Sequence, residues 1–136
     1  MARNTKHLPI YKAGYELVKL VAGSVRNFPR DYRSTLGLSM NSEAIALVLE
    51  VYRANAAEDK VYHISQIVEK MQVLEMLVQM SFDLRILSPD NYAQCIELFE
   101  GLGKQAGGWK KSSVARNIAN HNQPVYRRPE SSCVTA

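Results

Sequence analysis

Apolar residues spaced alternately three and four positions apart recur along most of this 136-residue chain. The spacing is clearest in one central seam, formed by Ile64, Ile67, Met71, Leu74, Val78 and Ser81. Because an α-helix has about 3.6 residues per turn, this spacing puts all six side chains on one helix face. A helix with one apolar face needs partners to cover it, so the chain is expected to fold as packed helices.

Four helices of roughly 20 residues, each about 30 Å long, are expected. Their expected bounds are Pro9 to Phe28, Asp31 to Ala57, Val61 to Leu87, and Pro89 to about Ser113. The last start is the best defined, because Ser88 can cap the helix and Pro89 suits its first position. Short turns between helices of this length predict an all-α, up-down-up-down four-helix bundle.

The first two helices are apolar on more than one side. The first carries two overlapping seams, one of Tyr11, Gly14, Val18, Val21, Val25 and Phe28, the other of Ile10, Ala13, Leu17 and Leu20. The second places Leu36, Met40, Leu47, Val51 and Ala54 inward, with Ile45, Val48 and Tyr52 on an adjoining strip. One seam suffices for a small bundle, so the extra strips indicate either a broad internal core or a subunit contact.

A chain of this length is most simply one domain. We expect the bundle to occupy residues 1–113 and a polar, basic, flexible tail to occupy residues 114–136, which lack an apolar period and contain Pro124 and Pro129. No apolar run approaches the roughly 20 residues of a membrane span, and no leader is recognisable. A cytoplasmic protein that does not enter the membrane is therefore expected.

The sequence offers little for catalysis. His7, His63 and His121 have no Ser or Cys that the sequence alone would pair with them, so they are interpreted as solvated. Cys95 and Cys133 show no metal-ligand spacing. We expect no enzyme activity, no metal and no cofactor.

Four glycines stand close together late in the fourth helix: Gly101, Gly103, Gly107 and Gly108. They lack the lysine pattern of a phosphate-binding loop. They indicate either fraying near the helix end or the close approach of another backbone or a phosphate. The sequence leaves both readings open.

Basic charge is concentrated at the two ends of the chain. Residues 1–33 carry seven Lys/Arg against two Asp/Glu, and residues 101–136 carry six against one. In the predicted bundle the first and fourth helices are antiparallel neighbours, which would group Lys6, Lys12, Lys104, Lys110 and Lys111, while Arg26, Arg30 and Arg33 would lie at the opposite pole. Such surfaces attract phosphates. The fourth helix carries an apolar seam of Tyr92, Cys95, Phe99, Leu102, Ala106 and Trp109. Trp109, at the end of this seam, is interpreted as a core residue, with base stacking as the alternative.

Five segments together resemble a known bacterial family. They are LPIYKAGYELVKLV, RNFPRDYRSTLG, VYRAN, LRILSPDNYAQ and GLGKQAGGWKKSS, in that order. The chain is similar to four-helix-bundle proteins that include the accessory variability determinants of diversity-generating retroelements and the proteins of 23S ribosomal RNA intervening sequences. The Phe-Pro-Arg turn and the Gly-Gly-Trp-Lys end resemble the first group more closely.

That resemblance implies a homopentameric barrel that binds template RNA or an RNA/DNA hybrid together with a reverse transcriptase, and supports mutagenic reverse transcription without catalysing it. The nucleic-acid-binding residues it implies are Lys12, Lys19, Arg26, Arg30, Arg33, Arg53, Lys104, Lys110 and Lys111. Gln72 and Gln79 stand where the family often has arginine, so no nucleic-acid contact is assigned to the third helix. The alternative function is a structural oligomer of the intervening-sequence type with no polymerase partner.

Overall fold

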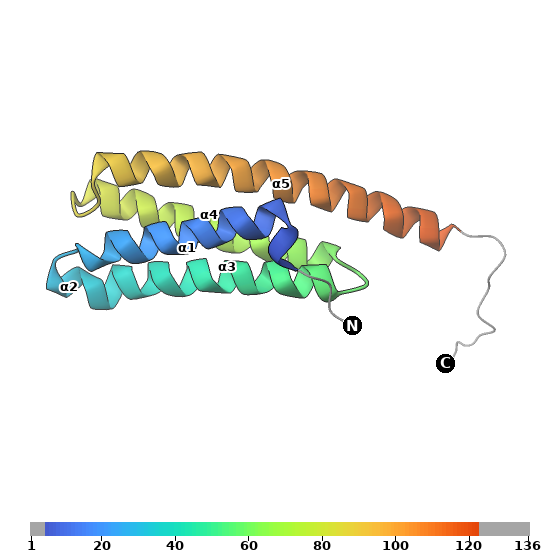
Figure 1. The fold of residues 1–136 in the computed structure, drawn as a ribbon, viewed down its shortest axis with the longest axis horizontal. Coiled ribbons are helices and arrows are strands. Elements are labelled where there is room, and N and C mark those ends of the chain that lie inside the picture. The colour runs from blue at the N-terminus through green and yellow to red at the C-terminus, as the bar shows by residue number, and fades with distance from the viewer. Residues whose placement is uncertain (1–4, 123–136) are drawn as a thin grey trace.

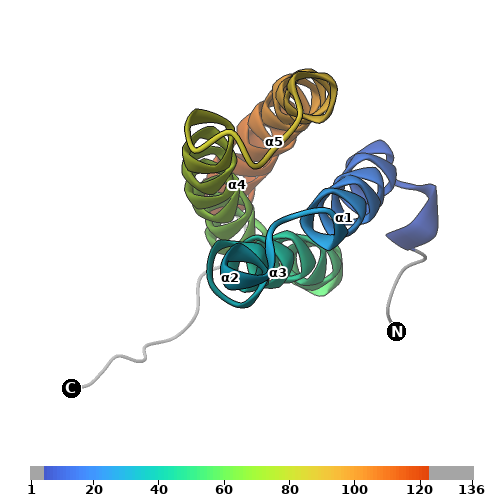
Figure 2. The ribbon, with the colours of Figure 1, turned by 90° about the vertical axis from the view of Figure 1, so that its left-hand side faces the viewer.

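The computed structural model describes residues 5–122, which form helices joined by short turns (Figure 1). In chain order these are η1 (Thr5–His7), α1 (Pro9–Arg26), α2 (Arg30–Tyr32), η2 (Arg33–Gly37), α3 (Leu38–Ala56), α4 (Val61–Asp83) and α5 (Pro89–His121). The long helices α1, α3, α4 and α5 run alternately up and down. Each packs on two neighbours, in the cyclic order α1, α3, α4, α5 (Figure 2). The predicted all-α four-helix bundle is confirmed; the number of subunits stays a prediction.

The predicted seams form the core. All six seam residues of α4 are buried, as are Cys95, Phe99, Leu102 and Ala106 of α5. Tyr92 and Trp109, at the two ends of the α5 seam, are partly buried and pack against this core. The three-and-four spacing therefore identified the inward faces of both helices correctly.

The extra apolar strips of the first two helices have different outcomes. On α1, Ile10 and Leu17 of the second seam are buried, so this helix contributes a broad face to the internal core. On α3, Ile45 is 50% exposed and Tyr52 is 49% exposed. Val48, the third residue of this strip, is partly buried and lies beside Gly14 of α1. The strip on α3 therefore faces away from the core at Ile45 and Tyr52, where another molecule could cover it.

The second predicted helix is continuous but not uniform. α2, η2 and α3 follow one another without a break, and η2 is a π-helical segment, with a wider turn than an α-helix. A Cβ atom on Gly37 would lie 2.5 Å from Val25 Cγ1, closer than carbon atoms can approach. Glycine at this position therefore lets the end of α1 pack against the wide turn.

Two predicted helix ends lie too far along the chain. α1 ends at Arg26 rather than Phe28, and α4 ends at Asp83 rather than Leu87. Arg85 adopts a left-handed conformation, with φ 64°, and the Ile86 N–H donates to the Ser81 carbonyl at 3.0 Å. This is the hydrogen bond of a Schellman helix end, where glycine is the usual residue. Because arginine stands in its place, nothing in the sequence indicated that the helix ends here.

The start of α5 is as predicted, but its end is not. Ser88 Oγ accepts a hydrogen bond from the Asn91 N–H at 3.1 Å, which confirms the cap. The helix continues past Ser113 to His121, so residues 114–121, which were expected to belong to the tail, extend α5. This extension reaches the α3–α4 turn, where Asn117 Nδ2 donates to Asp59 Oδ1 at 3.1 Å. The remainder of that tail, from residue 123, lies outside the described residues.

No helix within residues 5–122 combines the length and the apolar character that crossing a membrane requires.

Candidate nucleic-acid interface

A row of cations runs along the outward side of α1. Lys12, Lys19 and Arg26 are seven residues apart, which is almost two full helix turns, so their side chains share one face opposite the core. All three are exposed. Lys19 Nζ lies 2.9 Å from Glu16 Oε2, and the hydrogen bond and charge of Glu16 raise the pKa of this lysine. Lys12 and Arg26 have no acidic partner within residues 5–122. We call this row the α1 ridge.

A second group of cations lies on α5. Lys104 and Lys111 are also seven residues apart and share the outward side of their helix, whereas Lys110 points about 100° away from Lys111. All three are exposed. The start of α1 and this part of α5 line one hollow, to which Pro9 and Lys104 both contribute. The structure thus places Lys104 beside the start of α1, as the topology predicted.

The arginines of the opposite pole also gather. Arg26 ends α1, Arg30 begins α2, and Arg33 begins η2, all within one short connection (Figure 1). The three side chains are exposed, and none forms an ion pair with another of the described residues. We call Arg26, Arg30 and Arg33 the arginine pole. Arg26 therefore belongs both to the α1 ridge and to the arginine pole. Binding by any of these residues stays a prediction.

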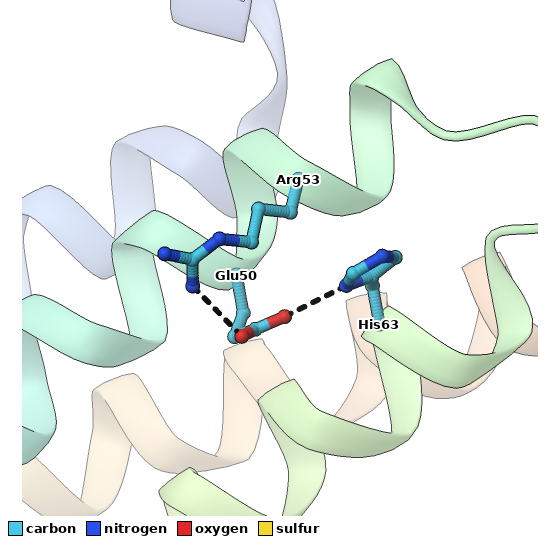
Figure 3. A network of polar contacts seen from close by, with 3 residues as sticks. All are labelled: Glu50, Arg53 and His63. Atoms are coloured by element: carbon cyan, nitrogen blue, oxygen red, sulfur yellow. Dashed lines mark hydrogen bonds and ion pairs between the residues drawn. The ribbon is translucent and has the colours of Figure 1, made fainter.

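Arg53 stands apart from the other candidates. Its Nη1 lies 2.9 Å from Glu50 Oε2 on the same helix, and the other oxygen of Glu50 lies 2.9 Å from His63 Nδ1 of α4 (Figure 3). Burial alone would raise the pKa of Glu50, which is 8% exposed, but hydrogen bonds from His63 and Arg53 hold that pKa below its usual value. Glu50 therefore links α3 to α4, and it offsets much of the charge that Arg53 could offer a phosphate.

Sequence reasoning missed this network. His63 is half-buried and engages Glu50, so its interpretation as a solvated residue was wrong. A partial signal existed, because Glu50 and Arg53 stand three apart, the spacing of an ion pair on a helix. The approach of His63 depends on how α3 and α4 pack, which spacing along the chain does not define.

The glycines of α5 present open backbone rather than close contacts. A Cβ atom on Gly101, Gly107 or Gly108 would meet nothing within 4 Å, and on Gly103 it would make an ordinary 3.7 Å contact with Met71 Cε. The helix does not end here, so neither early fraying nor close approach by another part of residues 5–122 explains them. Gly107 and Gly108, which are exposed, leave a stretch of α5 surface uncovered between Lys104 and Lys110.

Groups suited to catalysis are scarce in the described part of the chain. Burial raises the pKa of the Cys95 thiol to about 11, so little thiolate exists at neutral pH. Within residues 5–122, no three His, Cys, Asp or Glu side chains are grouped so that they could hold a metal ion.

Comparison with known families identifies the chain. Residues 9–113 match the bAvd-like family, the bacterial accessory variability determinants. The chain belongs to this family. Membership implies an accessory role in a diversity-generating retroelement, in a family whose members are generally not catalysts. No match was found among curated proteins. The matched range includes the α1 ridge, the arginine pole and the three α5 lysines.

Proposed function

We propose that this bAvd-like protein is the cytoplasmic accessory subunit that holds template RNA or an RNA/DNA hybrid for the reverse transcriptase of a diversity-generating retroelement. The observation that carries the proposal is the outward placement of basic residues on α1 and α5, within the range that matches the family. Exposed cations on a rigid helix face bind phosphates by releasing counterions, without reading the sequence. The polymerase performs the chemistry, and the accessory subunit positions the strand.

The same proposal includes assembly into a closed homopentamer. Exposed apolar side chains follow the outward side of α3 at spacings of seven, four and three: Leu38, Ile45, Leu49 and Tyr52. Met76 and Met80 of α4, with Leu84 directly after this helix, continue such a surface. We call these seven residues the α3–α4 face. A monomer rarely exposes so many large apolar groups together, so neighbouring subunits are the natural cover.

Contact with the polymerase is assigned to the acidic part of the chain. A template channel is basic, so a second basic protein is repelled unless RNA lies between them or acidic groups make the contact. The acids proposed for this contact are Glu43, Glu58, Asp59, Glu69 and Glu75. Glu50 is excluded because it is buried and bound to Arg53 and His63.

Nucleic-acid binding is tested with two triple variants of equal charge. Lys104, Lys110 and Lys111 are changed to Gln in one, and Arg26, Arg30 and Arg33 in the other. Binding of a single-stranded RNA is then measured across salt concentrations. For each subunit that the RNA contacts, loss of three phosphate contacts should flatten the slope of log K against log salt by about two. A flatter slope in only one variant assigns the site to that pole, and parent-like slopes in both variants contradict the proposal.

The polymerase contact is tested by capture of the cognate reverse transcriptase with and without nuclease. The five acids are changed to their amides, and the parent is the control. Capture that survives nuclease in the parent and fails in the variant supports acidic docking. Absence of any capture by the parent, with or without RNA, would favour the alternative of a structural oligomer that has no polymerase partner.

A further inference from the structure

A cleft between the start of α1 and the second half of α5 combines features that the phosphate-binding proposal does not use. It has a volume of about 330 Å³ and is lined by Leu8, Pro9, Ile10, Lys104, Gln105, Gly108 and Trp109. Most of the lining is apolar, and one wall is the partly buried ring of Trp109. This volume is at the small end of the range for ligand sites, which suits one flat ring system.

Gln105 supplies a polar group that lacks a partner. Its Oε1 atom is buried and accepts no hydrogen bond from the described residues. Buried polar atoms are nearly always paired, so an unpaired one in a cleft wall marks a place where a ligand donor fits. Gln105 is also one of the lining residues, so its side-chain amide is the neutral polar group that a ligand in the cleft would meet.

The charge around the cleft selects the kind of ligand. Lys104 forms part of the lining, and Lys111 stands on the same outward side of α5, two turns further along. Gly108 lies between these lysines, and nothing lies within 4 Å of the position where its Cβ would be. An apolar slot with an aromatic wall, between two cations, matches a nucleotide: the base enters the slot and the flanking phosphates meet the lysines.

We propose that this cleft binds one unstacked base of single-stranded RNA, with the base against Trp109 and its polar edge at Gln105. The inference rests on the proposed function, because the lysines that hold the phosphates are the same. It adds that bases as well as phosphates contribute to affinity. Stacking on an aromatic side chain tolerates every base, so it brings no sequence specificity.

Trp109 is the only tryptophan of the chain, so its fluorescence reports on the cleft directly. The full-length protein is titrated with a short single-stranded RNA and with an abasic strand of the same length, which keeps the phosphates and lacks the bases. The RNA should quench Trp109 emission and bind about tenfold more tightly than the abasic strand, within the range known for one stacked base. The abasic strand should bind through phosphates and leave the emission unchanged.

Three variants test the geometry. Gly108→Leu places a side chain in the cleft, whereas Gly107→Leu is the matched control, since Gly107 is equally open and does not line the cleft. Both replace glycine with a strong helix former, so the fold is retained. Gly108→Leu should lower RNA affinity to that of the abasic strand, and Gly107→Leu should bind like the parent. Trp109→Leu keeps an apolar side chain and should also remove the preference for bases.

Each outcome separates this inference from the proposed function. Equal affinity of the parent for RNA and abasic strand, without quenching, overturns the base site and leaves phosphate binding intact. Failure to bind either strand overturns both. Trp109 emission that changes with protein concentration, without nucleic acid, assigns the cleft to a second copy of the chain and also overturns the base site.

Discussion

The two sides of the bundle differ in charge and in polarity. Helices α1 and α5 carry seven Lys/Arg against four Asp/Glu, whereas α3 and α4 carry two against five. Exposed large apolar side chains show the reverse: α3, α4 and Leu84, which follows α4, have eight, and α1 and α5 have three. Because one core supports both sides, the outward residues alone decide what each side can bind. The basic side suits a polyanion, and the apolar side suits another copy of the protein.

The largest expected effect separates assembly from RNA binding. Changing Ile45 and Leu49 to Glu puts two charges in the middle of the α3–α4 face, where desolvation should cost at least about 2 kcal/mol for each subunit contact. Light scattering should then report a mass near the 15.3 kDa of one chain, instead of about five times that mass for the parent.

The matched control for assembly adds the same charges to the other side. Ala22 of α1 and Ala93 of α5 are exposed, so their change to Glu should leave the mass unaltered. If the Ile45 and Leu49 variant kept the mass of the parent, the α3–α4 face would not be the subunit contact.

A change in the shared scaffold should affect both sides together. Gly37→Ala forces a Cβ atom to within 2.5 Å of Val25 Cγ1, and overpacking of this kind costs about 1–3 kcal/mol. Urea unfolding at fixed protein concentration should show this loss. Gly23→Ala is the control, because its Cβ would meet nothing within 4 Å and should raise stability by up to about 1 kcal/mol. Equal stability of the two variants would contradict the close packing of η2 on α1.

The Glu50 network connects the two helices of the apolar side, and its contribution depends on pH. The pKa of Glu50 is lower in the folded protein than its ordinary value of 4.5, so its stabilisation is complete above that pH. It is lost as the pH falls through the folded-state pKa, because protonation then favours the unfolded chain. Glu50→Gln should lower the free energy of unfolding at pH 7 by about 1 kcal/mol and weaken its decline in acid.

Glu69→Gln is the control for this pH dependence, since Glu69 is an exposed carboxylate on α4. It should unfold like the parent at every pH. If the free energy of unfolding declined in acid by the same amount in Glu50→Gln and in the parent, the network would not link α3 to α4 energetically.

The smallest expected effect lies at Arg85, in the turn between α4 and α5. This residue belongs neither to the proposed RNA-binding cations nor to the α3–α4 face. Arg85→Gly removes the left-handed strain of a residue with a side chain and should raise stability by several tenths of a kcal/mol, up to about 1. RNA affinity should stay within twofold of the parent, although a positive charge is lost. A marked fall in affinity would show that RNA binding uses net charge rather than the basic side of the bundle.

The sequence predicted the features that depend on periodicity. The seam from Ile64 to Ser81 defined the inward face of α4, and Ser88 with Pro89 defined the start of α5. Helix ends were less predictable, because Arg85 takes the conformation that glycine usually marks. The end of α5 was missed because residues 114–121 lack the apolar seam of the earlier turns, and a contact such as that of Asn117 with Asp59 depends on the packing of the helices.

The candidate site was predictable only as a list of cations. Charge counts indicated a basic surface, and antiparallel packing placed Lys104 near the start of α1. The cleft beside Trp109 could not be predicted, since its walls come from residues nearly 100 positions apart in the chain. The engagement of Arg53 by Glu50 was hidden for a related reason, because burial of Glu50 depends on the position of α4.

The length of α5 has a consequence for any ring built from this chain. At 33 residues, α5 is nearly twice as long as α1, and its last turns run past the α3–α4 turn (Figure 1). Cyclic symmetry repeats one orientation of the subunit, so every projecting helix end would lie on the same rim. Such a ring has two unlike openings. A partner that contacts the projecting helix ends would therefore approach such a ring from one face only.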